Sequence, residues 1–336
     1  MTEQDRGSRA HDTAAKERSP RFPEWIRRPW ASGDAFSSTK ELLESLRLNT
    51  VCESARCPNL GECWQKRTAT FMILGNLCSR NCRYCSVPSG NPAGQIDHDE
   101  PERIAQAATA LGIRHVVITS VTRDDLEDGG AAHFARTIRA VRGSNPESTI
   151  EVLTPDFQGS GQSVEIVLEA GPDVFGHNIE TVRRLYPILR GTRCSYDTGL
   201  GVLSAASRMG AEAVLKSALM LGHGETEDEV IETLRDLRSA GCEAVALGQY
   251  LRPGRRQTEV VEFIHPEQFR QYEREAYALG FRFAVAGPFV RSSYHSEEMM
   301  RAGFAGRRKR TAPHEPAAAG MCRERNDPDE SRSVSA

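Results

Sequence analysis

The chain has 336 residues, a formal net charge of −3, and 39% hydrophobic and 26% charged residues. These values are typical of globular proteins and imply no general attraction to nucleic acid. No apolar stretch approaches the roughly 18 residues that a membrane helix needs, and the first twenty residues lack the apolar core of a secretory signal. We therefore expect a cytoplasmic protein with no membrane partner. Its nine cysteines are then better explained as ligands than as disulfides.

The N-terminal part of the chain divides into an arm and a helix. Residues 1–35 are polar and without hydrophobic period, so we expect them to be mostly disordered. Within this arm, the segment 21–26 is apolar enough to dock on the rest of the protein. Apolar residues at helical spacing then predict a short helix within residues 36–48.

The next segment carries a first cysteine triplet, formed by Cys52, Cys57 and Cys63. Pro58 and Gly61 indicate a turn-rich loop, which can wrap around a metal cluster. On its own such a triplet is weak evidence, because cysteines also serve structural roles. A second triplet follows closely, and the pair together favours metal binding.

The second triplet is Cys78, Cys82 and Cys85, spaced CxxxCxxC after an apolar run at residues 71–74 that predicts a buried strand. A loop of this kind can bind three irons of an iron–sulfur cube and leave the fourth free for another ligand. A zinc loop is an alternative, although no fourth Cys or His follows at a familiar zinc spacing. Unrelated surface or disulfide cysteines are a second alternative.

Strand-like and helical segments alternate through the rest of the chain. The strand-like runs are residues 115–121, 149–154, 174–179, 213–221, 244–250 and 283–286. Between them, a helix is expected at residues 104–111, and Thr226 and Glu229 form a capping box for a helix that Gly241 ends. Apolar strands alternating with helices predict a parallel α/β sheet covered by helices. The pattern does not separate a doubly wound sheet from a barrel.

Polar residues follow two of the predicted strands. Asp128, Gly129 and Gly130 form a turn that either approaches a ligand or caps the following helix. Asn178 and Glu180 alternate along a predicted strand and so face the same way. A ribose diol would satisfy two such buried groups, and a helix cap plus a surface acid is the alternative.

Four further residues stand apart from the triplets. Lys216 lies in an apolar strand, where it needs a carboxylate partner, either Glu180 or the carboxylate of a bound methionine group. We expect His223 to be an exposed loop histidine rather than a ligand. Cys194 and Cys242 are single thiols, and Cys242 is expected to pack half-buried after the end of a helix.

The C-terminal segment 301–336 is rich in Arg, Ala, Pro and Ser and is expected to be a disordered tail. The basic run at residues 307–310 fits a solvated tail better than a nucleic-acid site. Cys322 lies in this tail and is not expected to be a ligand.

The adjacent triplets resemble those of the lipoyl synthase family, in the radical S-adenosylmethionine superfamily. The CxxxCxxC spacing with an aromatic residue before its last cysteine looks like the superfamily signature. The resemblance runs over residues 21–295 and includes the Arg-Ser-Ser-Tyr segment 291–294. It implies a partial, six-unit (β/α) TIM-type barrel over residues 67–300, with a cluster-binding extension at 36–66 and the chemistry at the carboxyl ends of the strands.

The resemblance also implies the cofactors and the reaction. One [4Fe–4S] cluster, which cleaves S-adenosylmethionine, would bind Cys78, Cys82 and Cys85. An auxiliary [4Fe–4S] cluster, which donates sulfur, would bind Cys52, Cys57, Cys63 and Ser293. The implied reaction inserts two sulfur atoms at C6 and C8 of a protein-bound octanoyl-lysine. The substrate would be an octanoylated lipoyl domain or glycine-cleavage H protein, with a ferredoxin or flavodoxin as electron donor.

S-adenosylmethionine contacts follow from the same resemblance, which implies Tyr84, Asp128, Gly129, Gly130, Asn178, Glu180 and Lys216. The chain departs from the family pattern at residues 193–199, at His223 and at residues 254–257, away from the cysteines. These departures leave alternatives open. One is a radical paralogue with another substrate or with an auxiliary cluster used for electron transfer. The other is a non-catalytic iron–sulfur or zinc-binding regulator.

Overall fold

The computed structural model of the chain describes residues 22–27, 33–210, 212–294 and 296–304. The predictions for residues 1–21, for the basic run at 307–310 and for Cys322 lie outside the described residues. The division of the chain into the segments 1–35, 36–66, 67–300 and 301–336 stays a prediction.

A seven-stranded parallel sheet forms the centre of the molecule, and its strands follow one another in chain order. The strands are β1 (Thr70–Ile73), β2 (His115–Ser120), β3 (Thr149–Leu153), β4 (Val174–Gly176), β5 (Val214–Leu221), β6 (Ala244–Gln249) and β7 (Phe283–Gly287). Among the described residues β1 and β7 do not pair with each other, so the sheet is an open barrel with six crossovers. The predicted partial (β/α) barrel is confirmed.

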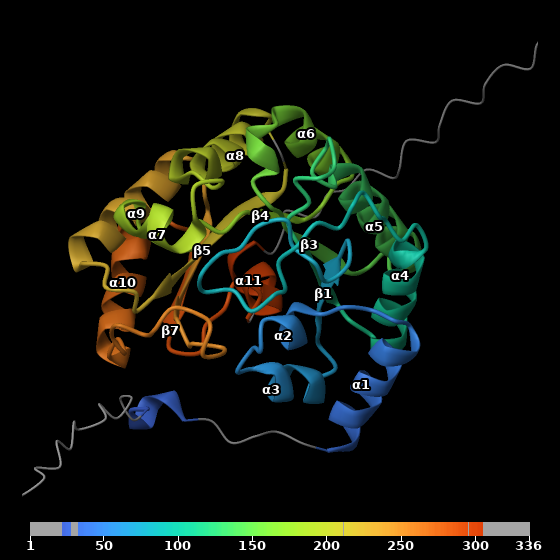
Figure 1. Cartoon of the computed structure of the whole chain (residues 1–336), viewed down its shortest axis with the longest axis horizontal. Coiled ribbons are helices and arrows are strands. Elements are labelled where there is room, and N and C mark those ends of the chain that lie inside the picture. Colours follow the sequence, from blue (N-terminus) through green and yellow to red (C-terminus); the bar gives the residue numbers. More distant parts are fainter. Residues whose placement is uncertain (1–21, 28–32, 211, 295, 305–336) are drawn as a thin grey trace, which may run out of the picture.

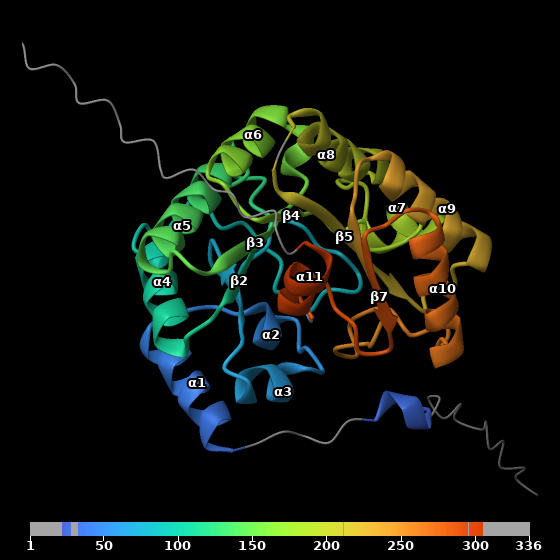
Figure 2. The same cartoon turned by 180° about the vertical axis from the view of Figure 1, so that it is seen from behind.

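Helices lie in every crossover. The longer crossover helices form the outer ring of the molecule in Figure 1 and, from behind, in Figure 2. They are α4 (Glu100–Leu111), α5 (Ala131–Ser144), α6 (Gly161–Glu169), α8 (Tyr196–Arg208), α9 (Glu227–Ser239) and α10 (Pro266–Ala278). The short elements are η2 (Phe157–Gly159), η3 (Arg183–Leu185) and α7 (Tyr186–Arg190). The predicted capping box of Thr226 and Glu229 is present at the start of α9.

The N-terminal elements lie across the open side of the barrel, between β1 and β7 (Figures 1 and 2). They are α1 (Asp34–Ser45), α2 (Val51–Ser54) and α3 (Leu60–Gln65). The buried Asn59 fixes them there, because its amide donates a 2.7 Å hydrogen bond to the carbonyl of Phe289 after β7. The last helix, α11 (Ser296–Gly303), lies inside the ring in both views.

The N-terminal arm docks as its apolar segment predicts. It forms a short helix, η1 (Glu24–Ile26), whose Trp25 ring packs edge-on against His265, with ring centroids 5.0 Å apart. The neighbouring Phe22 packs against Phe263 with centroids 5.7 Å apart. The arm therefore contacts the segment that leads into α10.

Two sequence predictions about local structure need correction. The fourth strand ends at Gly176 rather than at residue 179, because the amide of Ile179 donates to the Ser217 hydroxyl (3.1 Å) instead of a strand neighbour. The chain rejoins β5 only at Glu180, whose φ of +69° is left-handed. Cys242 is fully buried rather than half-buried. Of the described helices, none combines the length and apolarity needed to cross a bilayer.

Candidate functional site

A cavity of about 550 Å³ runs through the barrel, and the loops that follow the carboxyl ends of β2, β3 and β4 line it. This is the end at which barrels of this type place their chemistry. Both predicted triplets line the cavity, through Cys52, Cys57, Cys63, Cys78, Cys82 and Cys85. All six thiols are free rather than joined in disulfides.

The first triplet is presented by the segment that closes the open side of the barrel. Cys52 lies in α2, Cys63 lies in α3, and Cys57 lies in the loop between them. Burial and the neighbouring thiols raise the pKa of Cys52 and of Cys63 to about 12. Thiolates rather than thiols bind metals, so a cation bound at this triplet would also hold these cysteines in their ionised form.

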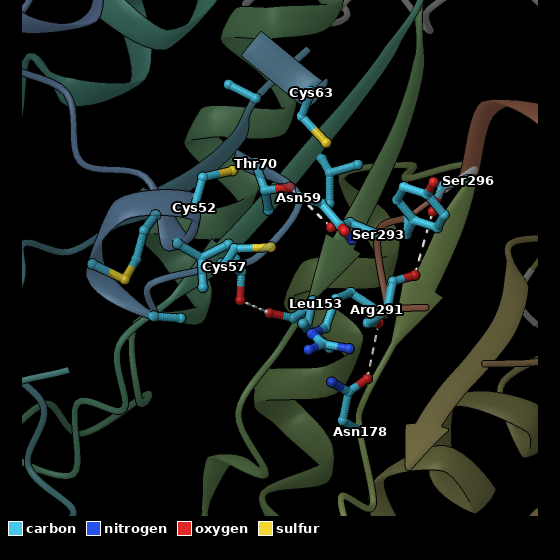
Figure 3. A pocket seen from close by; sticks show the side chains of 18 of the residues that line it. Cys52, Cys57, Asn59, Cys63, Thr70, Leu153, Asn178, Arg291, Ser293 and Ser296 are labelled. Carbon is cyan, nitrogen blue, oxygen red and sulfur yellow. Dashed lines mark hydrogen bonds between the residues drawn. The ribbon is translucent and has the colours of Figure 1, made fainter. Parts of the chain in front are cut away.

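Ser293 reaches the first triplet from the other end of the chain. In Figure 3 the sulfur atoms of the triplet point toward the part of the pocket where Ser293 lies. The Thr70 hydroxyl donates a 3.0 Å hydrogen bond to the Ser293 hydroxyl and so positions it beside β1. The structure therefore brings together all four residues predicted for the auxiliary cluster.

The second triplet lies on a loop held by the loops that follow other strands. The amide of Ser79 donates to the Thr122 carbonyl after β2 (3.0 Å), and the amide of Arg83 donates to the Leu189 carbonyl after β4 (2.8 Å). Burial raises the pKa of Cys85 to about 11. These anchors fix the cysteine loop over the mouth of the barrel.

Arg80, inside the second triplet, is a site residue that the sequence analysis missed. It is only 4% exposed, and its guanidinium binds Asp124 after β2 (2.8 Å) and Asp156 after β3 (2.6 Å). It also lies 3.3 Å from the sulfur of Cys194. Burial disfavours the charge, but the two carboxylates outweigh it and keep the Arg80 pKa above its usual value. The sequence did contain a signal for this site, namely an arginine within the cysteine motif and aspartates that follow two of the predicted strands.

Three predicted contacts of S-adenosylmethionine also line the cavity, namely Tyr84, Asn178 and Glu180. The Ser292 hydroxyl donates to the Asn178 side-chain oxygen (3.0 Å), which fixes that amide. Burial raises the pKa of Glu180, although Arg190 opposes the shift. Arg190 lines the same cavity and was not predicted from the sequence.

The spacing of these ligands argues against a single metal ion. Zinc needs four donors within about 2.0–2.3 Å of one point. Among the described residues, no three His, Cys, Asp or Glu side chains are gathered closely enough to share one ion. An iron–sulfur cube instead binds each cysteine through a different iron. Two thiol triplets facing one pocket therefore fit two iron–sulfur clusters.

Known proteins agree with this chemistry. The Radical SAM superfamily model matches residues 72–237, and the model for the N-terminal domain of lipoyl synthase of the Radical_SAM family matches residues 3–57. Lipoyl synthase of Thermus thermophilus is 50% identical over 82% of this chain and 86% of its own. The chain belongs to the lipoyl synthase family. The Caldanaerobacter subterraneus member is also 50% identical, over 82% of this chain and 96% of its own.

Membership of the lipoyl synthase family confirms the predicted cofactors, which are S-adenosylmethionine and [4Fe–4S] clusters. It also confirms the predicted enzyme class, a radical sulfurtransferase. The member from Sorangium cellulosum, 45% identical over 89% of this chain and 84% of its own, shows that the likeness extends well beyond the cysteine loops.

The turn at Asp128 does not line the cavity, although the sequence suggested cofactor contact. The Asp128 carboxylate accepts hydrogen bonds from the amides of Gly130 and Ala132, both 2.8 Å long, and so caps α5. Gly129 and Gly130 have φ values of 61° and 92°, which explains why glycine is used at both. The capping alternative describes the Asp128 side chain, and contact of this turn with S-adenosylmethionine stays a prediction.

Lys216 is another predicted contact of S-adenosylmethionine that does not line the cavity. Its ammonium binds Glu151 (2.8 Å) and the hydroxyl of Ser296 (2.7 Å), and Glu151 also pairs with His115 (3.1 Å). The prediction of a carboxylate partner was right, but Glu180 as that partner was wrong. Lys216 is the third residue of β5, too early in the strand to reach the carboxyl end.

His223 is buried, with 6% exposure, rather than exposed as predicted. Its ring stacks on Tyr250 with centroids 4.1 Å apart. Neither ring nitrogen has a hydrogen-bond partner among the described residues, and burial lowers the His223 pKa to about 4. The apolar pattern of β5 gave no sign that the loop after it folds beneath Tyr250.

Proposed function

We propose that this chain inserts two sulfur atoms, at C6 and C8, into the octanoyl chain of a protein-bound octanoyl-lysine. The observation that carries the proposal is the pair of cysteine triplets that face one cavity from two separate segments. One triplet alone would serve radical formation, and the second provides a separate cluster that can be consumed. Lipoyl synthases from Thermus thermophilus and Caldanaerobacter subterraneus, at 50% identity, support the assignment.

The target carbons are saturated, so acid–base chemistry has no access to them. No side chain is basic enough to remove a proton from such a carbon, whose C–H bond must therefore be broken homolytically. With both clusters and S-adenosylmethionine bound, the site supplies an adenosyl radical that takes the hydrogen atom and a sulfide that replaces it. The chain itself would hold these groups beside one another through the residues that line the cavity.

Cys78, Cys82 and Cys85 are proposed to bind the cluster that cleaves S-adenosylmethionine. Three ligands leave one iron open to the amino and carboxylate groups of that cofactor. Tyr84 and the polar pair Asn178 and Glu180 line the same cavity and are proposed to contact the cofactor. Ser292 holds the Asn178 amide in one orientation, which prepares it to bind a ligand.

Cys52, Cys57, Cys63 and Ser293 are proposed to bind the sulfur-donating cluster. The Ser293 oxygen would be a weaker ligand for iron than a thiolate, so it would be the most labile of the four ligands. The Thr70 hydroxyl donates a 3.0 Å hydrogen bond to Ser293 and would hold it at the site. The serine would thus be the point at which a bound cluster opens most readily.

The carrier and the electron donor are further parts of the proposal. The carrier would be an octanoylated lipoyl domain or glycine-cleavage H protein, because the reaction requires an octanoyl-lysine that can enter the cavity. The donor would be a one-electron carrier such as a ferredoxin or flavodoxin. We propose the cytoplasm as the location, where these partners and reduced thiols would coexist.

Anaerobic reconstitution tests the proposal. The protein is reconstituted with iron and sulfide, both are counted, and an octanoyl-lysine peptide is incubated with it and analysed by mass spectrometry. Two clusters per chain and a peptide carrying two sulfur atoms are expected. Release of deoxyadenosine without a sulfur-containing product would instead favour an auxiliary cluster used for electron transfer. Zinc in place of iron, with no cleavage, would contradict any radical function.

A further inference from the structure

The loop at residues 252–258, which follows β6, bridges the two cysteine loops. At one end, the loop contacts Arg56, which lies in the sequence between the first two cysteines of the auxiliary triplet. The Arg56 guanidinium donates a hydrogen bond to the Pro253 carbonyl (3.0 Å). At the other end, the Gln257 side-chain amide donates to the Cys85 carbonyl (3.0 Å). This loop therefore marks the seam where the two cluster-binding segments meet beside the cavity.

Four exposed arginines surround this seam, namely Arg56, Arg83, Arg255 and Arg256. Arg83 belongs to it because its carbonyl accepts a 2.9 Å hydrogen bond from the amide of Thr258. Arg255 and Arg256 lie between the two anchor points of the bridging loop. We call these four residues the arginine rim.

Nearby carboxylates do not neutralise the arginine rim. Those closest in sequence already have partners: Glu53 accepts from Thr50, Glu62 pairs with Lys66, and Glu259 pairs with Arg252. Within the described part of the chain, none of the four rim guanidinium groups forms an ion pair. Because the whole chain has a net charge of −3, this gathering of cations is local rather than a general property of the surface.

We propose that the arginine rim docks an acidic surface of the carrier protein that presents the octanoyl-lysine. This inference rests on the proposed function, since only an acyl group attached to a protein brings a protein surface to the cavity. A lysine whose acyl chain enters the cavity must place the surrounding carrier surface against the rim. Unpaired cations there attract carboxylates by long-range steering, and arginine binds them with two parallel hydrogen bonds.

The rim also offers a basis for choosing among carriers. Arg255 and Arg256 lie on the bridging loop after β6, whereas the cysteines lie on two separate segments near the N-terminal side of β1 and directly after it. Selection of the carrier and the radical chemistry would thus depend on different residues, so one can be altered without the other.

The experiment compares two double variants of the full-length, reconstituted protein. Arg255→Glu/Arg256→Glu reverses two rim charges, and Arg208→Glu/Arg235→Glu makes the same charge change on the exposed outer helices α8 and α9. KM is measured for an octanoylated lipoyl domain, for H protein, and for an uncharged octanoyl-lysine peptide. Iron content and thermal unfolding check that both variants are folded and loaded.

The rim variant should raise the KM for the carrier roughly tenfold or more at low salt, with the difference disappearing near 1 M salt. Its turnover of the uncharged peptide, and all properties of the α8–α9 variant, should match the unmodified protein. An unchanged carrier KM would overturn the proposal, and so would an equal loss of peptide turnover. The proposal would also be overturned if the rim variant lost binding to an RNA or DNA oligonucleotide but kept its binding to the carrier.

Failure of the proposed function would look different. In that case the unmodified protein would make no sulfur-containing product from the lipoyl domain, the H protein or the peptide. Carrier binding, measured by titration with the octanoylated domain alone, would still report on the rim. The two hypotheses can therefore fail separately.

Discussion

The hydroxyl of Thr70 donates a 3.0 Å hydrogen bond to the hydroxyl of Ser293, across 223 residues of chain. Thr70 begins β1, and Ser293 follows β7, so this bond joins the two ends of the open barrel. The cysteines of the first triplet approach the same position from α2, α3 and the loop between them (Figure 3). Closure of the barrel and assembly of the auxiliary site are therefore one structural event.

Replacing Ser293 by cysteine should strengthen the fourth bond to the auxiliary cluster. We expect Ser293→Cys to keep full iron content and deoxyadenosine release, but to form lipoyl product at least about tenfold more slowly, because an additional ~1.4 kcal/mol must then be spent on opening the cluster. Rapid-quench mass spectrometry measures that rate. Thr70→Val, which removes only the hydrogen bond, serves as the control. Product formation at the normal rate in Ser293→Cys would refute the proposed opening point.

The two cysteine triplets should serve two functions that mutation can separate. Cys82→Ala is expected to abolish reductive cleavage of S-adenosylmethionine, because the open-iron cluster loses a ligand. Cys57→Ala is expected to spare cleavage and to stop sulfur insertion. Chromatographic measurement of deoxyadenosine and mass spectrometry of the peptide distinguish these outcomes. Lipoyl product from Cys57→Ala, or continued cleavage by Cys82→Ala, would disprove the corresponding assignment.

Arg80 should hold the radical-forming loop in place. Arg80→Met leaves Asp124 and the buried Asp156 without their shared cation, a loss of about 3–5 kcal/mol for a buried pair. The variant should bind about half the iron of the unmodified protein, while the auxiliary cluster stays bound. Iron analysis and electron paramagnetic resonance measure this. Arg103→Met, which breaks the more exposed pair with Asp97, is the matched control and should retain all iron.

The pair formed by Lys216 and Glu151 should govern stability rather than catalysis. Burial opposes the Glu151 charge, but Lys216 and His115 outweigh it and lower the Glu151 pKa to about 2. Lys216→Met removes the ammonium partner of the buried Glu151 carboxylate and leaves it with His115, so the free energy of unfolding at pH 7 should fall by about 3–5 kcal/mol. Urea unfolding of the metal-free protein measures it. Glu151→Gln/Lys216→Met should recover part of the loss.

The same pair predicts a defined pH dependence. Because the folded-state pKa of Glu151 lies below its unfolded value of about 4.3, its contribution is complete above that value. It is lost as the pH falls toward 2. In Lys216→Met the Glu151 carboxylate lacks its ammonium partner, so its pKa should be higher than in the unmodified protein. The stability deficit of the variant should therefore shrink as the carboxylate takes up a proton. A deficit that stays constant between pH 7 and pH 3 would contradict this account.

The sequence predicted the parts of this molecule that depend on local pattern. The cysteine spacings predicted two ligand triplets, which the structure places on one cavity, and the alternation of apolar strands with capped helices predicted the parallel sheet. These signals are strong because ligand spacing and hydrophobic period are properties of short segments. The seam between the two cysteine loops could not be seen in this way, since Arg56 and Pro253 lie 197 residues apart.

The errors share a physical cause, which is that local patterns do not choose a partner. Lys216 needed a carboxylate, but only the register of β3 beside β4 and β5 makes Glu151 that partner. His223 was expected to be exposed because nothing nearby in sequence predicted that Tyr250 would cover it.

Labelling the sulfide of the protein tests the central claim most directly. The protein is reconstituted with heavy-isotope sulfide, freed of excess reagent, and given octanoyl-lysine peptide, S-adenosylmethionine and a reductant in medium containing ordinary sulfide. We predict that the first turnover yields a peptide carrying only heavy sulfur, while protein-bound sulfide falls in proportion to product. A product carrying ordinary sulfur, with the protein-bound sulfide constant, would contradict the account.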